Sequence, residues 1–136
     1  MALPRENPKG QCETILVVDD EAIIREVVRT ILESSSYQVV DVGNGNEALA
    51  LLEQNSAVDL LLTDVLMPDI NGIELAKEAK RLRPDLPILF ISGYWDKFEH
   101  SMRGFECVPK PFGPVELLSK VREVLSGVGH GTRLKS

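Results

Sequence analysis

Several features that would assign a protein to a particular class are missing from this chain of 136 residues. A membrane-spanning helix needs about 20 apolar residues in a row, and the sequence has no apolar run of that length. The first ten residues are polar and lack the apolar centre of a secretory signal peptide. Cys12 and Cys107 are the only cysteines, and they show neither metal-ligand spacing nor a disulfide pattern. We therefore predict a cytoplasmic protein with reduced thiols and no membrane contact.

Positive charge is also scarce. The chain has 15 Lys and Arg residues against 21 Asp and Glu residues, for a net charge of −6. Proteins that bind nucleic acids usually carry a basic patch. The one dense basic group, Lys80, Arg81 and Arg83, suits the end of a helix, where cations are favoured. The composition therefore predicts that the chain does not bind nucleic acid.

Short apolar runs alternate with amphipathic stretches along the chain. Continuous apolar runs are typical of strands that are covered on both faces of a parallel sheet. They lie at residues 15–18, 39–42, 60–63 and 88–92, with a weaker one around residues 107–108. Between them, apolar residues recur at the three- and four-residue spacing of helices. Two of these helices follow capping-box variants, formed by Asn44 with Glu47 and by Asn71 with Glu74.

The alternation predicts an α/β fold with a doubly wound parallel sheet over residues 13–126. Residues 1–12 and 127–136 are predicted to be a flexible N-terminal segment and a flexible tail. In such sheets, ligands bind beyond the carboxyl ends of the strands. That rule directs attention to Asp19, Asp20, Asp64, Ser92 and the loop before Pro111.

Three aspartates stand at predicted strand ends. Asp19 and Asp20 follow the first apolar run and Asp64 follows the third. If the two strands are neighbours, the three carboxylates converge, and their repulsion calls for a cation or raised pKa values. Mg²⁺ suits such oxygen ligands. Taken alone, Asp20 is better explained as a helix cap, and Asp64 is equally well explained as a turn residue.

Ser92 and Lys110 are weaker candidates when each is considered alone. Ser92 ends the fourth apolar run just before a glycine, as turn serines often do. Lys110 stands between two prolines, and a solvated loop lysine explains it as well. A functional Lys110 would supply a point charge for a phosphate oxygen.

Four sequence strings together resemble the response-regulator receiver family of two-component signalling. They are ILVVDDE, LLLTDVLMPDINGIEL, ILFISGY and VPKPF, and the resemblance covers about residues 14–125. It implies a flavodoxin-like sheet of five parallel strands in the order 2-1-3-4-5. The chain is similar to stand-alone receivers of the chemotaxis-regulator type and to receivers of hybrid kinases.

The resemblance also implies a role for each candidate residue. Asp64 would be the phosphoacceptor, forming an acyl phosphate. Asp20 and Asp64 would hold Mg²⁺, with Asp19 acting directly or through water and the backbone carbonyl of Leu66 completing the site. Ser92 and Lys110 would bind phosphoryl oxygens, and the peptide bond between Lys110 and Pro111 would be cis.

The implied partners are a sensor histidine kinase or a histidine phosphotransfer protein as donor, and an unidentified protein that receives the output. The chain would catalyse only its own Mg²⁺-dependent phosphorylation and dephosphorylation, as a monomer or weak dimer. It would not be a conventional enzyme. Two other hypotheses are a phosphorylation-independent interaction module and a metal-dependent phosphatase that acts on an external substrate.

Two features depart from the family pattern. Many receivers have Tyr or Phe three residues before the lysine, where this chain has Cys107. The segment between Ser92 and Lys110 is short by about one helical turn of 3.6 residues and has little apolar periodicity. We therefore predict that the fourth helix is short, irregular or absent.

Overall fold

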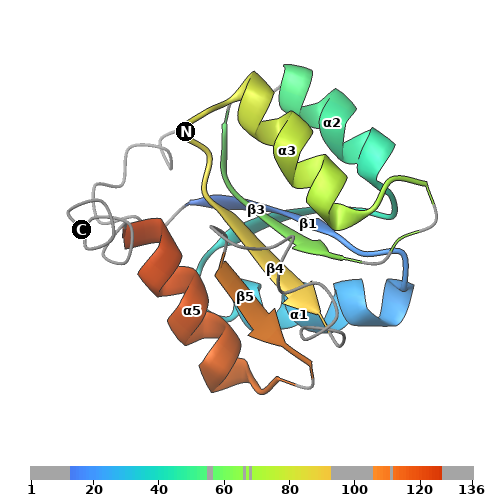
Figure 1. Cartoon of the computed structure of the whole chain (residues 1–136). Coiled ribbons are helices and arrows are strands. Elements are labelled where there is room, and N and C mark those ends of the chain that lie inside the picture. The colour runs from blue at the N-terminus through green and yellow to red at the C-terminus, as the bar shows by residue number, and fades with distance from the viewer. Residues whose placement is uncertain are drawn as a thin grey trace.

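The chain forms one five-stranded parallel sheet with helices on both faces (Figure 1). The computed structural model describes residues 13–54, 57–65, 67, 69–92, 106–110 and 112–126. The strands are β1 (Thr14–Val18), β2 (Gln38–Val42), β3 (Val58–Asp64), β4 (Ile88–Ser92) and β5 (Glu106–Pro109). Their order is β2-β1-β3-β4-β5, which confirms the predicted topology and all five apolar runs.

The burial of the strands explains why their sequences are continuous apolar runs. Every residue of β1 and β4 is buried, as are all but one of the residues of β3. Along β1, Ile15 and Val17 pack into one layer of the core, and Leu16 and Val18 pack into the other. A central strand therefore needs apolar side chains at odd and even positions alike.

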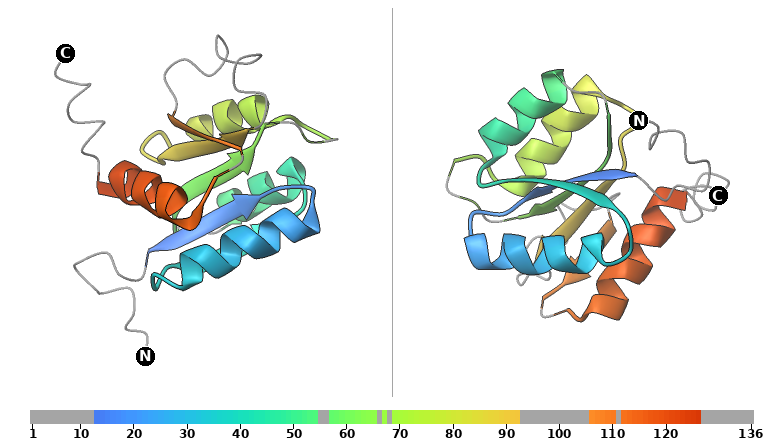
Figure 2. Two further views of the ribbon diagram at one scale, coloured as in Figure 1. Left: turned by 90° about the horizontal axis from the view of Figure 1, so that it is seen from below. Right: turned by 180° about the vertical axis from the view of Figure 1, so that it is seen from behind.

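In the part of the chain that the structure describes, two helices cover each face of the sheet (Figures 1 and 2). One face packs against α1 (Ala22–Glu33) and α5 (Pro114–Ser126), and the other against α2 (Gly45–Gln54) and α3 (Gly72–Leu82). Asn71 caps α3 by accepting a hydrogen bond from the Glu74 N–H (2.9 Å). Asn44 accepts one from the Glu47 N–H at the start of α2, also at 2.9 Å. Both predicted helix starts are confirmed.

Some sequence predictions concern residues outside the described ranges. These are the flexible ends, the short, irregular or absent fourth helix between Ser92 and Lys110, the peptide bond between Lys110 and Pro111, and the Leu66 carbonyl. Within the described ranges, no helix has the length and apolar character needed to cross a membrane.

Candidate functional site

Three aspartates meet at the carboxyl edge of the sheet. Asp19 and Asp20 follow β1, and Asp64 is the last residue of β3. Because Val18 is in register with Thr63, the two strands end at the same level. Asp19, Asp20 and Asp64 each offer a carboxylate oxygen, and these oxygens lie within 4.8 Å of one another. The predicted convergence of the three carboxylates is thus present.

Backbone N–H groups orient the two buried carboxylates. Asp19 Oδ1 accepts a hydrogen bond from the Glu21 N–H at 2.9 Å, and Asp64 Oδ1 accepts one from the Val65 N–H at 2.8 Å. Asp19 and Asp64 are 2% and 9% exposed, whereas Asp20 is exposed. Glu21 is the N-cap of α1, without a side-chain cap. Asp20 therefore does not cap this helix, and that interpretation of Asp20 was wrong.

The acidic cluster is electrostatically costly without a cation. Burial raises the pKa of Asp19 to about 6; Asp64 and Asp20 add to this, while the Glu21 N–H and Lys110 oppose it. Burial also raises the pKa of Asp64, against the opposing effect of Lys110. Among the described residues, Asp19 Oδ2 is buried and has no hydrogen-bond partner. A buried carboxylate oxygen without a donor is suited to a metal ligand, so the residues fit a hard divalent cation such as Mg²⁺.

Lys110 brings a positive charge to the same edge of the sheet. It follows β5, and its Nζ lies 3.7 Å from Asp64 Oδ2 and 3.9 Å from Asp19 Oδ2. Its backbone N–H donates to the Ser92 carbonyl at 2.9 Å. Lys110 therefore pairs with two carboxylates, unlike a loop lysine that only solvent surrounds.

Ser92 is the last residue of β4 and is 1% exposed. It is in register with Pro109 on β5, one residue before Lys110. The serine thus belongs to the strand and not to an exposed turn. Asp64, Ser92 and Lys110 come from the ends of three adjacent strands, β3, β4 and β5.

Between the end of β3 and the first turn of α3 lie two residues, Asp69 and Gly72, whose structural role the sequence analysis missed. A Cβ at Gly72 would lie 2.1 Å from the carbonyl oxygen of Asp64, so only glycine allows α3 to begin this close to the strand end. The Asp69 carboxylate accepts hydrogen bonds from the N–H groups of Gly45 (3.3 Å) and Asn46 (3.0 Å) at the start of α2. No local pattern indicated the Asp69 contact, because its partners lie 23 and 24 residues away.

Comparison with known proteins agrees with this architecture. The family model described as the response regulator receiver domain matches residues 15–122. The phosphate regulon transcriptional regulatory protein PhoB of Pseudomonas aeruginosa is 36% identical in an alignment of 126 positions, which covers 88% of this chain and 54% of PhoB. The chain spans about half the length of the curated relatives that it matches.

Two solved structures are similar over most of the chain. The response regulator protein TrrA of Thermotoga maritima, in complex with Mg²⁺ and BeF, is 34% identical with a TM-score of 0.75, over 82% of this chain and 98% of TrrA. The receiver domain of the hybrid histidine kinase CckA is 36% identical with a TM-score of 0.72, over 82% of this chain and 98% of that domain. On the family match, the sheet order and these likenesses, the chain belongs to the response regulator receiver domain family.

Proposed function

We propose that Asp64 accepts a phosphoryl group from a phosphohistidine on a sensor histidine kinase or a histidine phosphotransfer protein. The observation that carries this proposal is the set of three converging carboxylates with Lys110 beside two of them. The reaction would be cytoplasmic, and the receiver domain would extend over residues 13–126. A protein partner would receive the output.

Asp64 Oδ2 is the proposed nucleophile. Asp64 Oδ1 already accepts the Val65 N–H, whereas Oδ2 faces Lys110. Oδ2 forms a bond to phosphorus while the bond from phosphorus to the histidine nitrogen breaks, and the electron pair returns to the imidazole. The donor ring carries a proton on its other nitrogen and keeps it, so the products are an aspartyl phosphate and a neutral histidine.

The other site residues neutralise charge and hold the phosphoryl group in line for attack, which is most of what phosphoryl transfer requires. Lys110 would pair with one phosphoryl oxygen and Ser92 would donate a hydrogen bond to another. Mg²⁺, held by Asp19, Asp20, Asp64 and the Leu66 carbonyl, would supply positive charge to the phosphoryl oxygens. Water attack on the aspartyl phosphate would later return the carboxylate.

An apolar groove beside the site supports a protein as the phosphoryl donor. It lies between α1 and the start of α5 and is lined mainly by Ile23, Val27, Ile31, Phe112 and Pro114. Ile23 is 75% exposed and stands three residues after Asp20. A helix of the donor protein that packed here would hold its phosphohistidine near Asp64. The groove is therefore our proposed donor-binding surface.

Treatment with acetyl phosphate tests the site. Intact mass should show one phosphoryl adduct on the wild type with Mg²⁺ and none with excess chelator. Asp64→Ala should remain unmodified, while Asp59→Asn, at the opposite end of β3, should be modified like the wild type. A full adduct on Asp64→Ala would overturn the assignment of the phosphoacceptor.

Phosphotransfer from a phosphorylated histidine phosphotransfer protein tests the donor surface. Ile23→Ser should slow this transfer about tenfold without slowing the reaction with acetyl phosphate. Leu82→Ser is the matched control, because Leu82 is also exposed but ends α3 on the other face of the sheet. Equal effects of the two substitutions on transfer from the protein would refute the groove as the docking surface.

A further inference from the structure

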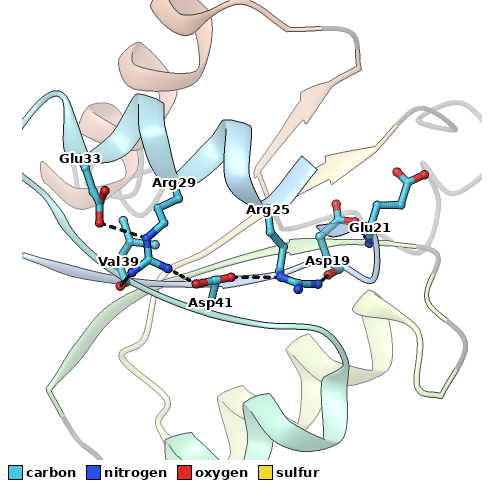
Figure 3. Close-up of polar contacts among 7 residues, drawn as sticks. All are labelled: Asp19, Glu21, Arg25, Arg29, Glu33, Val39 and Asp41. Carbon is cyan, nitrogen blue, oxygen red and sulfur yellow. Dashed lines mark hydrogen bonds and ion pairs between the residues drawn. The ribbon is translucent and has the colours of Figure 1, made fainter. Parts of the chain in front are cut away.

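Arg25, in α1, reaches from the helix to the backbone that carries the acidic cluster (Figure 3). Its Nη1 donates to the carbonyl oxygen of Asp19 at 2.7 Å, and its Nε donates to Asp41 Oδ2 on β2 at 3.1 Å. The side chains of Arg25 and Asp41 are each 23% exposed. One side chain thus connects α1, β2 and the end of β1.

The contact controls the peptide unit from which the first two site aspartates project. The Asp19 N–H donates to the Val42 carbonyl on β2 at 3.3 Å, and the Asp19 carbonyl accepts from Arg25. That carbonyl belongs to the peptide unit between Asp19 and Asp20. Holding it therefore sets the direction in which both carboxylates leave the backbone.

Gly43 gives the guanidinium room to reach this carbonyl. It directly follows β2, and a Cβ at this position would lie 3.2 Å from Arg25 Nη1. That distance is shorter than ordinary van der Waals contact between such atoms. A larger residue at position 43 would press on the guanidinium.

Asp41 holds Arg25 in place. Asp41 lies between the guanidinium groups of Arg25 and Arg29 and pairs with both, as Figure 3 shows. Arg29 also donates to the Val39 carbonyl at 3.3 Å and pairs with Glu33 at 3.1 Å. The positive charge of Arg25 is thus directed to Asp41, and its contact with Asp19 is to the backbone. Its influence on the cluster is accordingly one of geometry.

We propose that Arg25 is a positioning residue for the metal site: it holds the Asp19 carbonyl so that Asp19 and Asp20 converge on Asp64. The proposal rests on the proposed function. Three like charges within 4.8 Å repel one another, so a loop without this hydrogen bond would relax by turning the carboxylates apart. A cation would then have to gather its ligands on binding, which weakens its affinity. Groups that orient metal ligands typically contribute about 10–100-fold to metal affinity.

Mg²⁺ titration followed by calorimetry or NMR tests the proposal on the full chain. Arg25→Met should raise the Kd for Mg²⁺ about tenfold or more. The matched control is Arg29→Met, which removes another Asp41 partner from the same helix but no contact with Asp19. It should change the Kd less than about twofold. Both Kd values are measured below the onset of unfolding, so a general loss of stability does not move them.

Arg25→Lys gives a second measurement and covers the case in which Arg25→Met does not fold. Lysine keeps the charge but cannot bond Asp19 and Asp41 with separate nitrogens. The Kd of Arg25→Lys for Mg²⁺ should therefore exceed the wild-type Kd by about threefold or more, and it should lie below that of Arg25→Met when that variant folds. Wild-type affinity in Arg25→Lys would overturn the positioning role, and so would equal losses of affinity in Arg25→Met and Arg29→Met. If the wild type itself bound no Mg²⁺, the proposed function would fail instead.

Discussion

Replacing Asp19 by asparagine should stabilise the metal-free protein at neutral pH, although Asp19 belongs to the proposed site. Asp19 is 2% exposed, and its pKa is raised from 3.8 to about 6, chiefly by burial. A shift of this size means that ionising Asp19 costs the folded state about 3 kcal/mol more than the unfolded chain. Asparagine removes that cost and keeps an oxygen that can accept the Glu21 N–H.

The pKa of about 6 already includes the attraction of Lys110, whose Nζ lies 3.9 Å from Asp19 Oδ2, so this attraction takes nothing further from the gain. We expect a net increase in unfolding free energy of about 1–3 kcal/mol at pH 7, or roughly 4–10 °C in Tm. The sign follows from linkage: a carboxyl with a raised folded pKa contributes stability below its unfolded pKa and loses it as pH rises. The advantage of Asp19→Asn should therefore be small below pH 4, grow between pH 4 and 6, and stay constant above that range.

Denaturant unfolding in chelator at several pH values measures this difference. Asp59→Asn is the control, because Asp59 lies at the other end of β3 and accepts the Thr14 N–H at 2.8 Å; this substitution should not stabilise the protein. Saturating Mg²⁺ should raise the Tm of the wild type by mass action and that of Asp19→Asn much less. Equal or lower stability of Asp19→Asn in chelator at pH 7, or an advantage that does not vary with pH, would refute the reasoning.

Three further outcomes test the packing around the site. Gly72→Ala should lower the unfolding free energy by about 3 kcal/mol, because the new Cβ meets the Asp64 carbonyl. Gly113→Ala is the control and should lower it little, because a Cβ at Gly113 meets only a flexible side chain. Denaturant unfolding compares the two variants. Asp69→Ala should lower the unfolding free energy by about 1 kcal/mol, because the N–H groups of Gly45 and Asn46 at the start of α2 lose their acceptor. An unchanged unfolding free energy would show that this contact does not stabilise the protein. Burial acts to raise the pKa of Asp69, but hydrogen bonds from backbone N–H groups outweigh burial, so the pKa in the folded state is lowered. The contribution of Asp69 to stability should therefore be complete above its unfolded-state pKa and be lost as the pH falls through its folded-state pKa. Cys107, whose pKa burial raises to about 11, should react with iodoacetamide at pH 8 roughly a hundredfold more slowly in the native protein than in urea, as peptide mapping would detect.

Local patterns in the sequence were enough to predict the strands, the helix starts and the edge of the sheet that carries the site. A strand buried on both faces must be apolar throughout, so β1 and β4 are visible as runs of apolar letters. A parallel sheet brings its strand ends to one edge, so Asp64 and Lys110 could be grouped before any distance was known. The strand order itself came from the family resemblance and is confirmed by the pairing of the strands.

The braces around the site depend on contacts between segments far apart in the chain. Arg25 pairs with Asp41, 16 residues away, and Asp69 accepts hydrogen bonds from the start of α2. An arginine in a helix and an aspartate in a loop look like ordinary solvated residues until packing sets their neighbours. The same holds for Gly72, whose necessity comes from an Asp64 carbonyl that approaches it across the loop. Periodicity reports which side of an element is buried, whereas the contacts of a polar side chain depend on how the elements are placed against one another.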